Sequence, residues 1–322
     1  MSELPPGLRA AIDRELSGAS RKDLAARTAA TTDAYRAGRG SSAVIKGRDD
    51  ALAYALARLP ATYAADAAVF AEAQDRAPGF APKTLLDAGC GPGGGSWAAL
   101  EAWPSIAHVT WFDASEPFLE MAGRLADEGA KVLRGADRRR GDLLAGDLPK
   151  AELVLASYAL AEIAPAAQAA VVGRLWAACE GLLALVEPGT PAGYDRILAA
   201  RGTLIEAGAQ ILAPCPHAGA CPLVAPDWCH FSVRLPRSRD HRLAKGAAAP
   251  FEDEKYAYLL AARPEVAAEI ATGRVLARPK TGKAGIEFKL CGTDGVKPRF
   301  VPKRDKTLHT QVRRLGWGEA WP

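Results

Sequence analysis

Features that would direct this chain to a membrane or an oxidising compartment are missing from its sequence. No stretch of the 322 residues approaches the roughly twenty consecutive apolar residues that span a bilayer, so we expect no membrane segment. The start, MSELPP, has no basic stretch followed by an apolar run, and we expect no secretory signal. The six cysteines are therefore expected to stay reduced, which argues against a disulfide clasp. These absences predict a cytoplasmic protein, and we expect a monomer.

Several short catalytic motifs are also missing. The sequence contains no His-Glu-x-x-His helix, no Walker loop and no Gly-x-Ser-x-Gly elbow. We therefore do not expect a zinc peptidase, a P-loop nucleotidase or an α/β-hydrolase. Catalytic or ligand-binding residues therefore have to be identified from other sequence patterns.

The order of expected elements predicts an α/β fold with a doubly wound sheet. Residues 1–80 indicate helices, which we interpret as a cap packed on the next domain. Strands then alternate with helices through residues 81–212, which is typical of a parallel sheet. The expected strands are KTLLDAG (83–89), HVTWFDAS (108–115), KVLRGA (131–136), AELVLASYAL (151–160) and GLLALVEPG (181–189).

Residues 213–322 do not continue the alternation of strands and helices, and they form the third expected region. They begin with a cysteine-rich stretch and continue with strands separated by loops rich in Gly, Pro and Lys. We expect the first two strands, HFSVRLP (230–236) and KYAYLLAAR (255–263), to complete the sheet. GIEFKLC (285–291) and RFVPKR (299–304) are expected to form a small basic β extension.

A glycine-rich turn, LLDAGCGPGGGSW (85–97), joins the first expected strand to a helix. Glycines allow a sharp turn and close ligand approach, and the helix start offers unpaired N–H groups. Asp113 ends the second strand, where an acid can accept hydrogen bonds from ribose hydroxyls. The pattern resembles the first two motifs of class I S-adenosylmethionine-dependent methyltransferases. This resemblance implies that Asp87, Gly89, Gly91 and Gly93 line the cofactor, with Asp113 on the ribose and Asp142 or Asp147 near the adenine.

The segment after the fourth strand is where such enzymes hold the methyl acceptor. Amino-methylating relatives carry Asn/Asp-Pro-Pro-aromatic there, whereas this chain has Ser157-Tyr158-Ala159-Leu160. Tyr158 is expected to pack on the ligand, and Tyr158 and Glu162 are the candidate catalytic residues. Because neither matches a known acceptor motif, a binding protein with a methyltransferase fold stays open beside an enzyme.

Cysteine spacing predicts a metal site. Cys215, Cys221 and Cys229 are separated by five and seven residues, and Cys291 follows a long insertion. Four thiolates can hold an iron–sulfur cluster or one zinc ion. Zinc sites usually use close Cys-x-x-Cys pairs, which are absent here, so the spacing favours a cluster. A mixed zinc site with His217, His230 or His241, and unliganded buried thiols, both stay open.

Positive charge is concentrated near the end of the chain. Residues 274–314 contain twelve Lys or Arg against three acids. Cations that neutralise phosphates, next to rings that stack on bases, are typical of an RNA-binding surface. A solvated basic face with the rings buried beneath it is the alternative that stays open. The candidate RNA-binding residues are Lys303, Arg304, Arg313 and Arg314.

Five segments in one order resemble a known family. They are VEPGTPAGYDRILAAR, CPHAGACPL, WCHFSVRLPRSRDHRLAKG, FEDEKYAYLLAAR and RRLGWGEAWP. Together they are similar to the methyltransferase-like small-ribosomal-subunit assembly proteins of mitochondria and bacteria. The resemblance implies a four-iron–four-sulfur cluster on Cys215, Cys221, Cys229 and Cys291, S-adenosylmethionine binding, and small-subunit ribosomal RNA as partner. An active rRNA methyltransferase and a zinc-stabilised small-molecule methyltransferase are the alternatives.

Overall fold

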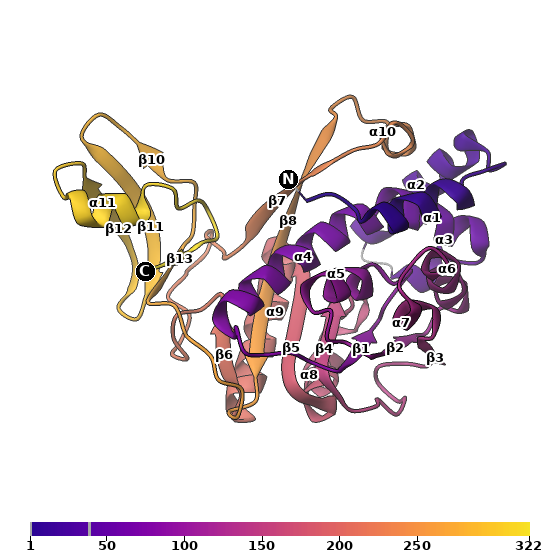
Figure 1. Cartoon of the computed structure of the whole chain (residues 1–322), viewed down its shortest axis with the longest axis horizontal. Coiled ribbons are helices and arrows are strands. Elements are labelled where there is room, and N and C mark those ends of the chain that lie inside the picture. Colours follow the sequence, from indigo (N-terminus) through magenta and orange to yellow (C-terminus); the bar gives the residue numbers. More distant parts are fainter. Residues whose placement is uncertain (1, 38–39) are drawn as a thin grey trace.

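The computed structural model describes residues 2–37 and 40–322. Figure 1 shows two parts, a larger α/β body and a smaller β unit beside it. The helices are α1 (Pro6–Glu15), α2 (Arg21–Arg36), α3 (Arg48–Ala57), α4 (Leu59–Arg76), α5 (Gly94–Ala102), α6 (Glu116–Ala126), α7 (Lys131–Arg134), α8 (Pro165–Ala178), α9 (Pro191–Glu206), α10 (Arg239–Lys245) and α11 (Lys306–Val312), with short 3₁₀ turns η1 (Ser41–Ala43) and η2 (Leu160–Glu162).

The α/β body is built on an eight-stranded mixed sheet of order β3-β2-β1-β4-β5-β8-β6, with β7 paired to β8. Neighbouring strands from β3 to β5 run parallel, whereas β8 is antiparallel to β5 and to both β6 and β7. The strands are β1 (Thr84–Ala88), β2 (His108–Asp113), β3 (Asp137–Arg140), β4 (Ala151–Ser157), β5 (Cys179–Pro188), β6 (Gln210–Ala213), β7 (Phe231–Pro236) and β8 (Phe251–Ala262).

Helices cover both faces of this sheet, as a doubly wound fold requires. One face packs on α4, α5 and α6, with α3 packed against α4 and α6, and the other face packs on α8 and α9. Alternating side chains divide between the two cores: Leu153 and Leu155 of β4 contact the first, whereas Val154 and Ala156 contact the second. The predicted α/β class, and the completion of the sheet by β7 and β8, are confirmed.

The third strand was predicted in the wrong place. KVLRGA forms the short helix α7 and its following turn, and the strand is Asp137–Arg140, sequence DRRR. This strand lies at the edge of the sheet and all four of its residues are exposed. An edge strand without a buried face needs no apolar residues, so its sequence carries no hydrophobic pattern.

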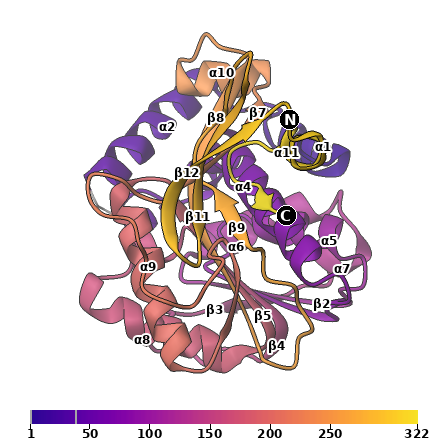
Figure 2. The same cartoon turned by 90° about the vertical axis from the view of Figure 1, so that its left-hand side faces the viewer.

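A separate five-stranded sheet forms the small β unit. Its strands are β9 (Gly273–Val275), β10 (Lys280–Thr281), β11 (Gly285–Gly292), β12 (Gly295–Pro302) and β13 (Ala320–Trp321). Ile286, Phe288, Val301 and Val312 make its own small core beneath α11. The predicted β extension is therefore present, and Figure 2 shows it in front of the large sheet.

Candidate functional site

A cleft of about 550 Å³ lies at the carboxyl ends of β1, β2 and β4, where open α/β sheets bind ligands. Gly89, Gly91 and Asp113 form one part of its lining, as the glycine-turn pattern predicts. The residues after β4, including Tyr158 and Glu162, form another. Parallel strands place these loops at one edge, which explains why segments about seventy residues apart meet.

Asp113 fastens the glycine turn. Its carboxylate accepts hydrogen bonds from Gly91 N (2.8 Å) and Ser115 N (2.8 Å). Gly89 and Gly91 adopt positive φ angles of 77° and 52°, a conformation that favours glycine. Burial raises the pKa of Asp113 to about 6, although the two backbone donors oppose this effect. The carboxylate thus both shapes the turn and faces the cleft.

Asp87 and Gly93 do not line the cleft. The Asp87 side chain is buried behind the turn, where it accepts a hydrogen bond from Ser96 Oγ (2.7 Å). Burial raises the pKa of Asp87 to about 7. Gly93 precedes α5 with φ 82°, and a Cβ there would lie 3.3 Å from the Cβ of Ala122. Both residues support the turn from behind.

Tyr158 and Glu162 lie in the cleft, and each side chain has a protein partner. Tyr158 adopts an unusual φ of 57° and donates from its hydroxyl to Glu254 of β8 (2.8 Å). Burial raises its pKa well above the ordinary value. Glu162 accepts a hydrogen bond from Ser41 Oγ (2.7 Å). Of the two candidate adenine ligands, Asp142 lines the cleft and Asp147 does not.

The N-terminal helical region supplies a wall of the cleft that sequence reasoning missed. Ser41, Ile45, Lys46 and Tyr54 line it, although this region was interpreted as a cap without chemistry. No local motif marks these residues, and they reach the cleft because α3 packs on α6 beside the glycine turn. Long-range packing of this kind leaves no signal in residue spacing.

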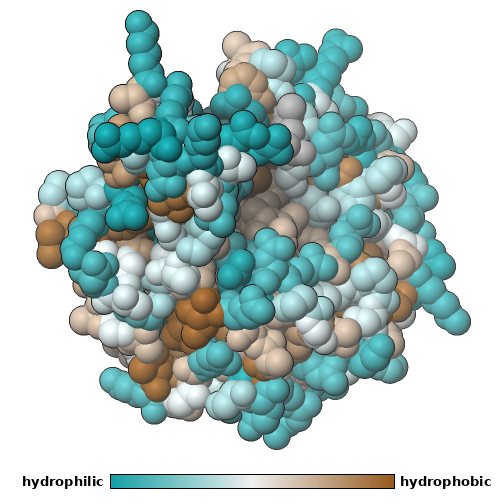
Figure 3. All heavy atoms as spheres, turned by 60° about the vertical axis from the view of Figure 1, so that its left-hand side comes forward, coloured by the Kyte–Doolittle hydropathy of each residue, from teal (hydrophilic) through white to brown (hydrophobic). Residues whose placement is uncertain are grey.

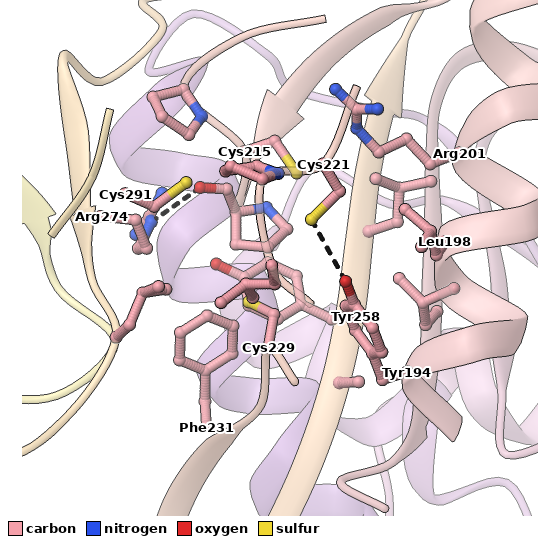
Figure 4. A pocket seen from close by; sticks show the side chains of 18 of the residues that line it. Tyr194, Leu198, Arg201, Cys215, Cys221, Cys229, Phe231, Tyr258, Arg274 and Cys291 are labelled. Atoms are coloured by element: carbon pink, nitrogen blue, oxygen red, sulfur yellow. Dashed lines mark hydrogen bonds between the residues drawn. The ribbon is translucent and has the colours of Figure 1, made fainter. Parts of the chain in front are cut away.

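The four predicted thiols line one small cavity of about 40 Å³ between the two sheets. Figure 4 shows Cys215, Cys221, Cys229 and Cys291 arranged around it. Cys215 and Cys221 lie in the loop after β6, Cys229 just precedes β7, and Cys291 is in β11 of the small sheet. The remaining cysteines, Cys90 and Cys179, do not line this cavity.

Two buried arginines, which the sequence did not single out, organise the cavity. Arg201 of α9 donates to the carbonyls of His217 (2.7 Å) and Gly219 (2.8 Å), holding the loop between the first two thiols. Arg274 of β9 donates to Pro214 O (3.0 Å) and Gly318 O (2.9 Å) and pairs with Glu72 of α4 (2.6 Å). These contacts join the small sheet to the α/β body.

Burial raises the pKa of the Cys291 thiol to about 11 and that of Cys229 well above its ordinary value. Nearby Arg274 acts in the opposite direction on both. Buried thiolates therefore require a compensating positive charge. Arg201 Nε is also buried without a hydrogen-bond partner in the part of the chain that the structure describes. The donor set and its surroundings fit an anionic, thiolate-bound group.

Of the three histidines considered as zinc ligands, one lines the cysteine cavity. His217 lines the cysteine cavity, whereas His230 stacks on Trp228 and His241 lies in α10 beside Glu252 (3.5 Å). Within residues 2–37 and 40–322, no three His, Cys, Asp or Glu side chains are arranged to hold a single metal ion.

The four predicted RNA-binding residues are all exposed in the small β unit. Lys303 and Arg304 follow β12, and Arg313 and Arg314 follow α11. Phe300 of β12, which is close to Lys303 in the sequence, is 54% exposed. Figure 3 shows mostly hydrophilic surface where this unit comes forward.

Comparison with known families settles the relationship of this chain. The family described as mitochondrial small ribosomal subunit Rsm22 matches residues 48–322. The chain belongs to this family. The match includes the glycine turn, the cysteine loop and the small β unit. It begins at α3, so it also covers Tyr54 of the cleft wall.

A human relative is named ribosome assembly protein METTL17, mitochondrial, and is 29% identical over 294 residues. The alignment covers 84% of this chain but 62% of the relative, so the chain spans less than two thirds of the relative's length. Among solved structures, magnesium protoporphyrin IX methyltransferase from Synechocystis with bound SAM is 18% identical, covering 63% of this chain and 80% of that one, at a TM-score of 0.42. A putative RNA methyltransferase from Pyrococcus horikoshii is 10% identical, covering 64% and 87%, at 0.41.

No helix among the described residues is long and apolar enough to cross a membrane.

Proposed function

We propose that this chain is a small-ribosomal-subunit assembly factor that binds S-adenosylmethionine in the cleft and an iron–sulfur cluster in the cysteine cavity. It contacts small-subunit ribosomal RNA through the small β unit. The observation that carries the proposal is that one cavity brings together three thiols from the loop between β6 and β7 and Cys291 of the small sheet. Family membership and the printed name of the human relative support the ribosomal role.

The cleft supports S-adenosylmethionine through Asp113, the glycine turn and a size suited to a small ligand. When bound, this cofactor supplies an activated methyl group. Gly89 and Gly91 allow close approach of the backbone, and Asp113 offers carboxylate oxygens to hydroxyls. Isothermal titration of the purified chain with S-adenosylmethionine tests this part, and absence of binding at millimolar concentration would overturn it.

Cys215, Cys221, Cys229 and Cys291 would hold a four-iron–four-sulfur cluster, which would link the loop between β6 and β7 covalently to the small sheet. A cavity lined by four thiols supports a thiolate-bound group, and the absence of close Cys-x-x-Cys pairs favours a cluster over one zinc ion. Anaerobic purification should yield a brown protein with iron and sulfide. A colourless protein with one zinc per chain would overturn the cluster.

The RNA part rests on the exposed cations Lys303, Arg304, Arg313 and Arg314. Their role as phosphate contacts predicts that co-sedimentation with small subunits weakens as salt rises. Binding whose strength does not change with salt concentration would contradict this role. Purification from the native cells, with ribosomal RNA and proteins scored together, identifies the partner directly.

An active rRNA methyltransferase is the second candidate, and the cleft is the observation that favours it. Tyr158 and Glu162 are then the groups nearest an acceptor, although each already contacts Glu254 or Ser41. Transfer of a labelled methyl group to small-subunit RNA distinguishes the two candidates. A zinc-stabilised small-molecule methyltransferase is the least supported of the alternatives, because the basic β unit has no role in it.

Cytoplasmic location and a monomeric state remain predictions. The human relative carries a mitochondrial assignment in its name. Fractionation of the native cells and gel filtration of the purified chain test these two points.

A further inference from the structure

Three aromatic rings meet at the junction of the two sheets, beside the cysteine cavity. Trp228 and His230 lie on either side of Cys229 in the sequence, and their rings stack with centroids 4.8 Å apart and planes 17° apart. Trp317, from the C-terminal segment, meets His230 edge-on at 4.9 Å. All three side chains are partly exposed rather than buried in a core. The rings therefore form a cluster that solvent can reach.

Lysines from both sheets lie next to this ring cluster. Trp228 Nε1 donates to Gly189 O (3.1 Å), and Gly189 N in turn donates to Lys255 O of β8 (2.8 Å). Lys255 is exposed. On the other side, Lys289 of β11 pairs with Asp227, the residue before Trp228. Figure 1 shows that β8 and β11 belong to the two separate parts of the fold, so the cations approach the rings from both.

The chemistry of this junction matches an unpaired nucleotide. Bases expose their faces only when they leave a duplex, and they then stack on aromatic side chains. Cations beside the rings neutralise the phosphates that accompany each base. A purely structural ring cluster would need neither solvent access nor lysines from two different sheets.

We propose that the ring junction, defined as Trp228, His230, Trp317, Lys255 and Lys289, binds single-stranded RNA by stacking unpaired bases. This inference rests on the proposed RNA-binding function and adds a second contact to the exposed tail cations. The tail cations contact phosphates without regard to strand pairing, whereas the junction selects RNA whose bases are unstacked.

The test uses the full chain, purified anaerobically, with two fluorescent probes of equal length: a short oligouridylate and a blunt RNA duplex. Trp228→Leu should weaken oligouridylate binding about tenfold, within the range measured for base–aromatic stacking. Trp228→Phe should retain most of the affinity because it keeps a ring. Binding of the duplex should change less than about twofold in either variant.

A second variant, Lys255→Ala, leaves all three rings in place. Because Lys255 is an exposed residue of β8, its removal should not disturb the cysteine loop, which Trp228→Leu could do. Lys255→Ala should weaken oligouridylate binding about threefold and reduce the slope of log affinity against log salt by about 0.7. Lys131→Ala, an exposed lysine of α7, is the matched control and should change neither value. Visible absorbance and thermal unfolding of each variant report whether the cysteine site and the fold are intact.

The outcomes separate the inference from the function on which it rests. If the wild-type chain binds neither probe, the RNA-binding function fails. If it binds RNA, and Arg313→Ala with Arg314→Ala weakens binding while Lys255→Ala and Trp228→Leu do not, the function stands and the ring junction is wrong. Equal losses for Trp228→Leu on both probes would also overturn the selection of unpaired bases.

Discussion

The cleft and the cysteine cavity are assembled in different ways. Most of the cleft comes from loops that follow neighbouring parallel strands, so one topological rule brings its residues together. The cavity instead uses a loop after β6, the start of β7 and a strand of a second sheet. The cleft can therefore form within the α/β body alone. The cavity exists only when the small β unit is attached, which makes it the more fragile of the two.

The largest expected effect is the loss of a cavity thiol. Cys291→Ala should abolish the visible absorbance of the anaerobically purified chain, because a cluster held by three thiolates is readily lost. Cys179→Ala is the control, since Cys179 is buried in β5 away from the cavity. Iron content and absorbance are the measurements. If both variants stayed equally brown, Cys291 would not be a ligand.

Removal of Arg274 should have the next largest effect. Arg274→Leu leaves two carbonyls without their buried donor and leaves Glu72 with Arg76 (3.2 Å) as its ion-pair partner. We therefore expect a cost of about 3 kcal/mol of unfolding free energy, the lower end of the range for breaking a buried pair. Denaturant unfolding measures this cost. Arg299→Ala, an exposed residue of β12, should change stability by less than about 0.5 kcal/mol. Proteolysis should release the small β unit first in the Arg274 variant.

Substitutions of Asp113, which lines the cleft, and of Asp87, which lies behind the glycine turn, should distinguish a residue that contacts the ligand from one that supports the turn. Asp113→Ala should weaken S-adenosylmethionine binding by about tenfold or more, since it removes a charged acceptor and frees the glycine turn. Asp87→Asn should change that affinity less than about threefold, because the side chain faces away from the cleft. Calorimetric titration of both variants checks the difference, and an equal loss in both would contradict the assignment.

The pKa of Asp87 also predicts how stability depends on pH. Because its folded pKa of about 7 exceeds the ordinary carboxyl value, the folded state binds the proton more tightly. Unfolding free energy should therefore fall as pH rises from about 4 to about 7. The Asp87→Asn variant should lack this pH-dependent contribution to the unfolding free energy, which is about 4 kcal/mol for three pKa units. Denaturant unfolding at pH 4 and pH 8 measures this contribution, and parallel wild-type and variant dependences on pH would refute it.

The smallest effect belongs to the exposed tail. Arg313→Ala and Arg314→Ala should each lower the slope of log affinity against log salt by about 0.7–0.9 and leave stability unchanged. Filter binding to small-subunit RNA at several salt concentrations measures the slope. An unchanged slope would remove these residues from the RNA surface.

Much of the fold could be read from apolar patterns, and the failures have physical causes. Buried strands such as β4 and β5 contain the apolar runs LVLA and LLALV, and both were predicted. β3 was missed because its side chains are exposed. The glycine turn was found because positive φ angles at Gly89 and Gly91 demand glycine locally. The cleft wall that contains Tyr54 was missed because it forms by packing between segments more than thirty residues apart. Such packing requires no particular residue pattern within either segment.

The sequence by itself determined which chemistry was available: a glycine turn with Asp113 at a strand end, four separated thiols, and a basic C-terminal region. Each depends on residue type or on conformations of neighbouring residues. Tertiary structure alone decided that Asp87 lies behind the turn, that Cys291 of the small sheet lines the same cavity as Cys215, and that Arg274 bonds to the chain beside Cys215. These outcomes depend on burial and on contacts between distant segments, which spacing along a chain does not encode.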